Sequence, residues 1–486
     1  MADQPNILLI VSDQHARDIM GCAGDEVVRT PNLDALAARG VRFENAYCGS
    51  PLCVPSRMTM LTGRHCSDIG VWSNSCYLGS DIATFAHSLG AAGYETVLCG
   101  RMHFIGPDQR HGFHRRIIGD VTGYTQLGGG PGTGLTTELA AATGQSYPAV
   151  ATSGAGRTAY QAYDEAVGAR AQQFLIERDS DQPLLLVAGF VLPHCPFVAR
   201  KELFAYYHER VPMPEIPDGY LERMPEPMKH WREVRGVTGL TEEQIRCARA
   251  AYYGMVEHFD EIVGGVLAAL AHSPLGSNTV VIYVSDHGES AGRNGLWWKS
   301  NFYEHSVGVP MILAGPGVAE GQTRSQVVSL LDLAPTLTEL GGGPELPLVS
   351  GQSLLPLLRS APPAHWRDEA LAELIGLGPQ YEHPARMIRR GPWKLVHYEA
   401  YEPMLFNLEE DPGEFEDRAA DPQCRDVRSY LHDRLLSGWD PERAQRAMRR
   451  SRMGAGAIRA FAQRLPREYY AEDAWSPPED CNTWPE

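Results

Sequence analysis

One cysteine in the first part of the chain stands in a setting that a purely structural thiol does not need. The stretch Ser50–Arg64 reads SPLCVPSRMTMLTGR, with Pro55, Ser56 and Arg57 close behind Cys53. A cysteine used as a small apolar residue needs no such neighbours. Proline is tolerated in a first helical turn because its missing N–H would be unpaired there, so we expect a helix to begin at Pro55. Cys53 would then lie just before a helix N-terminus, where an anion is favoured; an ordinary buried or reactive thiol is the alternative.

Polar residues follow four short apolar runs that are typical of buried strands. The runs are Ile7–Val11, Thr96–Cys99, Leu184–Val191 and Val280–Val284. The residues that follow them, in the same order, are Ser12-Asp13-Gln14, then Arg101 and His103, then His194, and last Ser285-Asp286-His287-Gly288. Taken singly, each has an ordinary role, such as a cap, a turn or a surface charge. Ligands of open α/β sheets bind outside the carboxyl ends of the strands, so parallel neighbours would bring these side chains to one edge.

Three of these residues suit a divalent cation. Asp13 and Asp286 supply charge, and His287 supplies a nitrogen that Mn²⁺ accepts more readily than Ca²⁺ does. Gln14 adds a neutral oxygen. A set with only two negative charges would leave the metal a strong electrophile.

Helical patterns alternate with the apolar runs, which predicts an α/β sheet with helices on both faces. We expect these helices at Asn32–Arg39, Ile82–Ala91, Ala162–Glu177 and Glu242–Ala271. Two stretches break the alternation: Gly119–Gly156 is predicted to be a long surface loop, and the Pro-rich Val211–Leu240 is predicted to be irregular. Loops of this length inside a domain are usually functional.

The pattern changes after Leu358. The segments MIRRGPWKLVHY and MLFNLEEDPGE predict a small antiparallel unit with an Asp-Pro-Gly turn, and an Arg-rich helical segment follows from Asp426. We therefore expect a catalytic α/β domain over residues 1–365, a small antiparallel subdomain over 366–425, and a helical segment with a tail over 426–486.

Composition excludes several partners. The chain has 486 residues and a net charge of −17, so a nucleic acid is not expected as a partner, and a site for an anion must be locally cationic. No apolar run is long enough to cross a membrane, so no membrane partner is expected. The N-terminus lacks the features of an export signal and the ten cysteines form no CxxC pair, which predicts reduced thiols in the cytoplasm.

At Cys53-Val54-Pro55-Ser56-Arg57 and Leu61-Thr62-Gly63-Arg64 the chain resembles the formylglycine-dependent sulfatases of the alkaline phosphatase superfamily. In that family the cysteine is oxidised to formylglycine by a modifying enzyme that reads the proline and arginine. Lys299, in WWKSNFYEHSVGVP, matches the family's Lys-x-x-x-Tyr-Glu element. The resemblance runs from Asn6 to about Leu408 and implies a mixed, mostly parallel sheet between helices, with a smaller C-terminal antiparallel sheet.

Within the family, GRMHFIGPDQRHGF and the Asp13-Gln14 pair look most like the choline-sulfatase and phosphonate-monoester-hydrolase branch. Three positions differ from common family patterns. Most sulfatases have Asp where Gln14 stands and Asn or Gln where His287 stands, and the branch usually has Lys where Arg101 stands. Arginine keeps the charge but changes the hydrogen-bond geometry.

The resemblance implies a role for each candidate residue. One divalent metal ion, Ca²⁺ or Mn²⁺, would be bound by Asp13, Gln14, Asp286, His287 and the modified Cys53. Arg57 would orient the hydroxyls of the hydrated aldehyde, and His103 would be the base. The remaining roles are the binding of sulfate oxygens by Arg101, Lys299 and Asn74, and protonation or stabilisation of the leaving oxygen by His194 or Lys299. For Asn74, an ordinary turn residue is the alternative.

The implied reaction is hydrolysis of a small sulfate monoester to sulfate and an alcohol. Aryl sulfates would be accepted, and phosphonate and phosphate esters would be side substrates because their tetrahedral groups look alike to the site. Three alternatives remain open: a phosphonate monoester hydrolase or phosphodiesterase, a choline-O-sulfatase, and a non-catalytic binding protein built on this fold. A non-catalytic protein would not need to keep the two metal carboxylates and the Cys53 motif, and this chain has all of them.

The C-terminal residues Tyr469–Glu486 carry four aromatic rings and a Ser-Pro-Pro step. So many aromatic residues are unusual in a free tail, and the prolines favour an extended chain. We expect an arm that joins subunits of a homodimer or homotetramer; the alternative is that the tail packs against its own chain.

Overall fold

An eight-stranded sheet forms the centre of the computed structural model, which describes residues 4–106, 108–121, 134–375, 383–462, 464, 475, 477–478 and 481–483. The strand order is β10-β2-β9-β8-β1-β6-β3-β4, and only β9 runs antiparallel to its neighbours. The strands are β1 (Asn6–Ser12), β2 (Gly40–Tyr47), β3 (Glu95–Gly100), β4 (Arg115–Ile118), β6 (Leu184–Gly189), β8 (Thr279–Ser285), β9 (Met311–Ala314) and β10 (Gln322–Ser329). The predicted mixed, mostly parallel sheet is confirmed.

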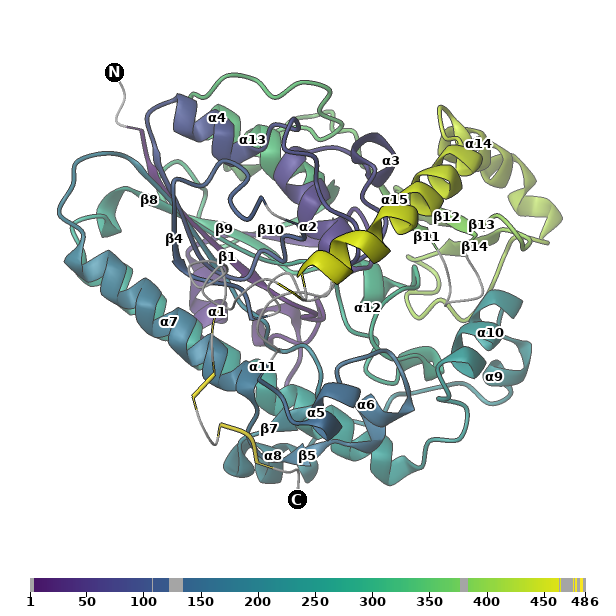
Figure 1. The fold of residues 1–486 in the computed structure, drawn as a ribbon. Coiled ribbons are helices and arrows are strands. Elements are labelled where there is room, and N and C mark those ends of the chain that lie inside the picture. The colour runs from purple at the N-terminus through teal and green to yellow at the C-terminus, as the bar shows by residue number, and fades with distance from the viewer. Residues whose placement is uncertain are drawn as a thin grey trace.

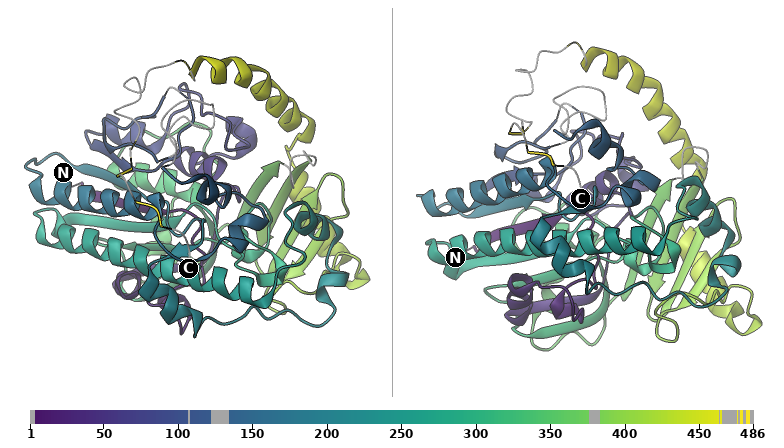
Figure 2. Two further views of the ribbon diagram at one scale, coloured as in Figure 1. Left: turned by 60° about the horizontal axis from the view of Figure 1, so that its bottom comes forward. Right: turned by 90° about the horizontal axis from the view of Figure 1, so that it is seen from below.

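The central strands are buried along their whole length because helices cover both faces of the sheet. Every residue of β1, β6 and β8 is buried. On one face lie α1 (Pro31–Ala38), α7 (Ala159–Glu177) and α11 (Glu242–His272), and on the other lie α2 (Cys53–Thr62), α4 (Phe85–Ala91) and α13 (Leu333–Gly341) (Figures 1 and 2).

Helix starts differ from the predicted ones where a capping residue fixes them. Thr84 caps α4, so this helix begins at Phe85 and not at Ile82, and Thr158 caps α7, which begins at Ala159. The α2 helix begins at Cys53, two residues before the predicted start, because Pro55 fits anywhere in the first turn.

Both stretches predicted to lack regular structure contain helices. Val211–Leu240 holds α9 (Tyr220–Arg223) and α10 (Glu226–Val234), and α10 is stabilised by burial of Met228 and Trp231. In Gly119–Gly156, residues 122–133 lie outside the described residues, and the rest includes α5 (Thr137–Ala141) and α6 (Tyr147–Ala151). Short connecting elements complete the catalytic part: α3 (Cys66–Ile69), β5 (Gly154–Ala155), β7 (Val198–Ala199), α8 (Lys201–His208) and α12 (Glu304–Val307).

A second, four-stranded antiparallel sheet follows in the order β11-β12-β13-β14. Its strands are β11 (Glu369–Ile375), β12 (Pro384–Arg390), β13 (Trp393–Tyr398) and β14 (Met404–Asn407). The predicted antiparallel unit is confirmed. The β12–β13 turn contains Gly391, at φ 52°, and the predicted Asp411-Pro412-Gly413 turn follows β14, where the Glu414 N–H donates to Asp411 O at 3.1 Å. Two helices, α14 (Arg425–Leu436) and α15 (Pro441–Ala462), come next, and Met448 of α15 returns to Cys76 with its Sδ 3.9 Å from that Sγ.

The described residues of the tail contact their own chain. The Trp475 ring meets the Tyr163 ring edge-on at 5.1 Å, the Thr483 N–H donates to Arg157 O at 2.8 Å, and Asn482 Oδ1 accepts from Ala159 N. These contacts match the alternative in which the tail packs back. Among the described residues, no helix is both long and apolar enough to cross a membrane.

Candidate active site

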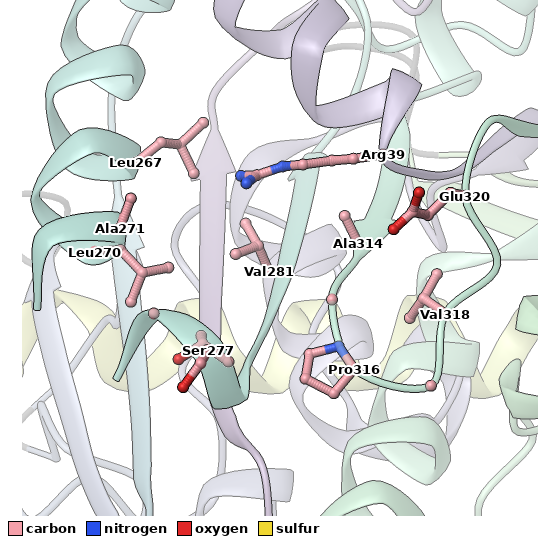
Figure 3. A pocket seen from close by; sticks show the side chains of 14 residues that line it. Arg39, Leu267, Leu270, Ala271, Ser277, Val281, Ala314, Pro316, Val318 and Glu320 are labelled. Carbon is pink, nitrogen blue, oxygen red and sulfur yellow. The ribbon is translucent and has the colours of Figure 1, made fainter. Parts of the chain in front are cut away.

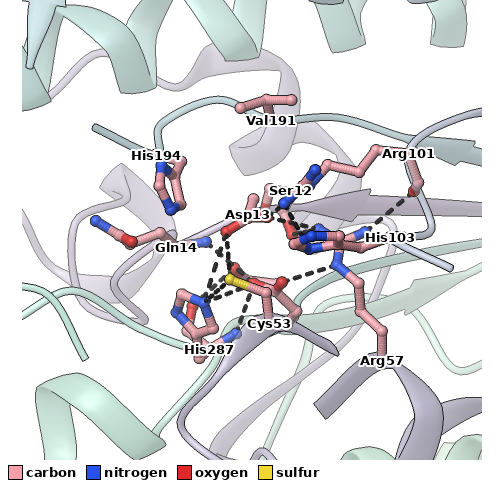
Figure 4. A network of polar contacts seen from close by, with 12 residues as sticks. Ser12, Asp13, Gln14, Cys53, Arg57, Arg101, His103, Val191, His194 and His287 are labelled. Atoms are coloured by element: carbon pink, nitrogen blue, oxygen red, sulfur yellow. Dashed lines mark hydrogen bonds and ion pairs between the residues drawn. The ribbon is translucent and has the colours of Figure 1, made fainter. Parts of the chain in front are cut away.

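Four neighbouring strands end side by side and bring their polar residues together. The strands β8, β1, β6 and β3 are neighbours in that order, and their register aligns their carboxyl ends. Val11 of β1 pairs with Val284 of β8 and with Gly189 of β6, and Gly189 pairs with Gly100 of β3. Asp13, Arg101, His194 and Asp286 therefore lie at one edge of the sheet, as expected. Figure 4 shows most of these side chains converging.

Cys53 lies at the centre of this group. Its Sγ is 3.2 Å from His287 Nε2 and 3.7 Å from Asp13 Oδ1 (Figure 4). His287 Nε2 is also 3.6 Å from both Asp13 Oδ1 and Asp286 Oδ1. One ligand atom from each of these four buried residues lies within 4.8 Å of those from the other three.

Arg57 holds both carboxylates from the opposite side. Its Nε donates to Asp286 Oδ2 at 2.8 Å and its Nη2 to Asp13 Oδ2 at 3.2 Å. The Oδ2 atoms are thus engaged, and the Oδ1 atoms face Cys53 and His287. Asp286 Oδ1 also accepts the backbone N–H groups of Gln14 and His287, which fixes its orientation.

Arg101 and His103 form a second group after β3. Arg101 Nε donates to Asp13 Oδ2 at 2.9 Å, and Arg101 Nη2 donates to His103 Nδ1 at 2.7 Å. Because guanidinium can only donate, Nδ1 of His103 accepts and the ring proton is on Nε2. Asp120 holds both residues, since its carboxylate accepts from Arg101 Nη1 and from the His103 N–H.

Lys299 lies between Gln14 and His194. Its Nζ donates to Gln14 Oε1, and to His194 Nε2 at 2.7 Å. His194 Nδ1 donates in turn to Cys195 O at 2.6 Å. Glu289 orients Gln14 by accepting from its Nε2 at 2.6 Å, so that Oε1 points to Lys299.

Asn74 takes a different place from the rest. Its Oδ1 accepts the Val54 N–H at 3.0 Å, which satisfies one of the unpaired donors at the start of α2. In this structure Asn74 therefore holds the helix that carries Cys53.

Electrostatics keep the site charged although it is buried. Burial alone would raise the pKa of the Asp13 carboxyl, but Arg101, Arg57 and Lys299 hold it well below its usual range. Burial opposes the charge of Lys299 as well, and Cys53 and Asp13 nevertheless raise its pKa. Burial and the Arg101 charge lower the pKa of His103 well below its ordinary value, so this ring is neutral.

Two residues of the site were missed by the sequence analysis. Asp120 falls within the stretch predicted as a loop, where nothing marks it. Glu289 follows the Asp286-His287 pair by two residues, and this proximity is the one signal that could have found it. Both residues bind predicted site residues and orient them, and neither contacts Cys53 in the hydrogen bonds described above.

The donor set fits a divalent metal ion. Two carboxylate oxygens and one imidazole nitrogen face a common point, and Arg57 on the far side binds the Oδ2 atoms instead of the Oδ1 atoms that face this point. The carboxylate oxygens suit Ca²⁺ or Mn²⁺, and the imidazole nitrogen is accepted more readily by Mn²⁺ than by Ca²⁺. Gln14 Oε1 is held by Lys299 and lies beside this set.

One cavity lies away from these residues. It has a volume of about 520 Å³ and is lined by the starting residue of β8, Thr279, by the final residue of β9, Ala314, and by Arg39 and Glu320 (Figure 3). It is therefore at the opposite edge of the sheet from Cys53 and holds none of the predicted residues.

Comparison with known proteins identifies the family. The sulfatase family model matches residues 5–343, and the model of the N-sulphoglucosamine sulphohydrolase C-terminal region matches residues 292–439. The chain is 33% identical to choline-sulfatase of Rhizobium meliloti, covering 92% of this chain and 89% of that one, and 29% identical to arylsulfatase K of Rattus norvegicus, covering 88% and 79%. The phosphonate monoester hydrolase of Agrobacterium radiobacter shares the fold, with a TM-score of 0.74 at 23% identity over 89% of this chain and 95% of that one. The chain belongs to the sulfatase family of the alkaline phosphatase superfamily and is a sulfuric ester hydrolase.

Proposed function

We propose that the chain is a formylglycine-dependent sulfatase that hydrolyses sulfate monoesters of small alcohols. The observation that carries this proposal is the position of Cys53 Sγ, at the first residue of α2 and within 3.7 Å of both His287 Nε2 and Asp13 Oδ1. Oxidised and hydrated, Cys53 would supply one hydroxyl to attack sulfur and a second whose deprotonation restores the aldehyde and releases sulfate.

The metal ion, Ca²⁺ or Mn²⁺, would be held by Asp13, Gln14, Asp286 and His287 and would polarise the nucleophile and a sulfate oxygen. Arg57 keeps the two carboxylates in position. It follows Cys53 by four residues and so shares its helix face, from which we assign it the orientation of the hydroxyls at residue 53.

Arg101 and Lys299 supply the local positive charge that an anionic substrate needs in a chain of net charge −17. Lys299 and His194 form a pair across 2.7 Å, and we assign this pair the protonation of the leaving oxygen. When Arg101 turns to a sulfate oxygen, His103 Nδ1 loses its donor, and this nitrogen becomes the base that takes the second hydroxyl proton. Asn74 was predicted to bind sulfate; its bond to Val54 supports a role in holding α2 instead.

Measurements on three kinds of ester test which substrate is preferred. The choline-sulfatase relative makes choline-O-sulfate the first alkyl ester to test, and matched aryl sulfate and aryl phosphonate esters test the phosphonate alternative. We expect kcat/KM to be higher for the sulfate ester of each matched pair. A higher value for the phosphonate would assign the native activity to phosphonate hydrolysis.

The modification has its own test. Co-expression with a formylglycine-generating enzyme should replace the Cys53 sulfur by a carbonyl oxygen in the mass of its peptide. Full turnover by protein that retains the thiol would contradict the proposal. We place the enzyme in the cytoplasm, where the thiols of its ten cysteines would stay reduced.

A further inference from the structure

Two packed helices bring a histidine, a glutamate and a cysteine together outside the catalytic residues. His208 is the last residue of α8, and Glu243 and Cys247 lie in the first turns of α11. His208 Nε2 is 2.9 Å from Glu243 Oε1, and Cys247 Sγ is 3.3 Å from the same oxygen. One ligand atom from each of the three residues lies within 4.8 Å of those from the other two.

The positions of these side chains follow from helix geometry. Glu243 and Cys247 are four residues apart, so they point to the same side of α11. The α8 helix can lie close to α11 because Gly254 stands at the contact, where a Cβ would come within 2.8 Å of Ala199 Cβ and 3.2 Å of Leu203 Cβ. The Phe204 ring packs against the His208 imidazole, with centroids 5.4 Å apart, and supports its orientation.

The chemistry of the three donors is that of a zinc site. Imidazole nitrogen, carboxylate oxygen and thiolate sulfur are the ligands of Zn²⁺, whereas Ca²⁺ and Mg²⁺ take oxygen. With bonds of about 2.0–2.3 Å, tetrahedral ligand atoms are separated by roughly 3.3–3.7 Å. The 3.3 Å between Cys247 Sγ and Glu243 Oε1 falls within that range, and the 2.9 Å between His208 Nε2 and Glu243 Oε1 lies just below it. We propose that His208, Glu243 and Cys247 bind a zinc-type divalent cation, with water as the fourth ligand.

Such a cation would tie the end of α8 to the start of α11 without touching the catalytic residues. Binding requires the thiolate, so the Cys247 proton is released to solvent as the Zn–S bond forms. Burial, together with Glu243, raises the pKa of the free Cys247 thiol to about 11, so without the metal this thiol stays protonated at neutral pH. The alternative is a surface ion pair between His208 and Glu243 in which Cys247 binds no metal.

Alkylation of Cys247 in the full-length protein separates these readings. Its rate is followed by peptide mass with Zn²⁺, with Mg²⁺ and with no added metal. We expect Zn²⁺ to slow the reaction by at least about tenfold, because even outer-shell partners of a metal are worth that much in affinity. Mg²⁺ should have no effect. Cys22, the other partly exposed thiol, lies beside Asp34 and serves as the internal control that reacts at one rate throughout.

Matched variants complete the test. His208→Gln and Glu243→Gln should each remove the protection, whereas Glu242→Gln, at the neighbouring acid, should leave it intact. An alkylation rate of Cys247 that does not respond to Zn²⁺ overturns the proposal. Full protection that persists in His208→Gln also overturns it, because the thiol would then bind zinc without the cluster. Because the readout is Cys247 itself, Zn²⁺ bound near Cys53 does not affect the result.

Discussion

At the scale of single residues, the site is a set of buried charges that hold one another in position. Arg57 bridges Asp13 and Asp286, and Arg101 binds Asp13 and Asp120. Removing one partner of a buried ion pair leaves an uncompensated charge, which typically costs about 3–5 kcal/mol. Substitutions here therefore change stability as well as chemistry, and conservative variants are needed to tell the two apart.

Asp286→Asn removes the charge but keeps the size of the side chain, and its amide oxygen can still accept from Arg57. We expect metal affinity to fall by more than about 100-fold, beyond the effect of losing an outer-shell partner, and sulfatase activity to be lost. Metal content and turnover measure this. Asp286→Ala is the comparison and should unfold more easily, since Arg57 then loses a buried partner. Stoichiometric metal and near-normal kcat in the Asn variant would refute our metal site.

His194→Ala should affect substrates according to their leaving groups. A general acid contributes about 10²–10⁴-fold when the departing oxygen needs a proton and little when it does not. We therefore expect a large loss of kcat/KM for alkyl sulfates and a small loss for nitrophenyl sulfate. A plot of log kcat/KM against leaving-group pKa should become steeper. Equal losses across the series would assign His194 to sulfate binding or to structure.

His15 should make stability depend on pH. Its Nε2–H donates to Ile19 O at 2.9 Å, and burial lowers the pKa of the ring to about 4. The unfolded value is about 6.5, so between these pH values the unfolded chain binds more protons. This contribution, roughly 3 kcal/mol, is complete above pH ~6.5 and is lost as pH falls towards 4. Urea unfolding of wild type and His15→Gln at several pH values should show a shallower dependence in the variant; parallel curves would exclude His15.

At the scale of elements, α2 carries Cys53, which we propose as the nucleophile, and is fixed at both ends. Asn74 accepts the Val54 N–H near its start, and Ser56 Oγ donates to Asp286 O at 2.5 Å. The helix ends at Thr62, and Gly63, which follows it, has φ 67° and donates its N–H to Thr59 O. A left-handed residue at this position is favourable only for glycine.

Gly63→Ala should lower the free energy of unfolding by about 1–2 kcal/mol from backbone strain alone. Its Cβ would also come within 3.0 Å of Val349 Cγ1, which adds to the loss. Gly70→Ala, at the end of α3, is the matched control, since it has φ 72° but nothing within 4 Å of the added carbon. Denaturant unfolding compares the two. A smaller loss for Gly63→Ala than for Gly70→Ala would contradict this account.

At the scale of the whole molecule, distant parts of the chain meet at the sheet edge. The small C-terminal sheet reaches the Lys299 segment through Lys394, whose Nζ donates to Phe302 O at 2.8 Å and Glu304 Oε1 at 3.0 Å. The tail reaches Asp120, because the Trp475 N–H donates to its carbonyl oxygen at 3.3 Å. Asp120 in turn holds Arg101 and His103.

Deleting the residues after Arg467 should therefore impair catalysis. Loss of Trp475 removes the N–H that donates to the Asp120 carbonyl oxygen, and displacement of a positioning group can cost up to about 100-fold in kcat/KM. We propose that the chain forms a homodimer or homotetramer, and because the described tail residues contact their own chain, we expect the truncated protein to keep its oligomeric mass. Light scattering and steady-state kinetics measure both quantities. A smaller species would show that the tail joins subunits.

Much of the fold and site could be predicted from local signals. The apolar runs located β1, β3, β6 and β8, because strands buried on both faces must be apolar throughout. Helix starts were less accurate where a cap such as Thr84 decides them. The α10 helix was missed because the prolines of this stretch predict irregular structure. The helix is stabilised by burial of Trp231, which is a tertiary effect.

The sequence by itself determined the family, the position of Cys53 in its motif and the strand-end residues, since motif spacing and apolar runs are properties of the chain alone. Only the tertiary structure decided how these residues meet. Three features depend on distances between segments far apart in the chain. They are the choice of carboxylate oxygens that Arg57 binds, the His103 tautomer that Arg101 fixes, and the contact by which Asn74 holds α2. The roles of Asp120 and Glu289 were also decided by the tertiary structure, because a buried charge acquires its function from the partners that folding brings within hydrogen-bond reach.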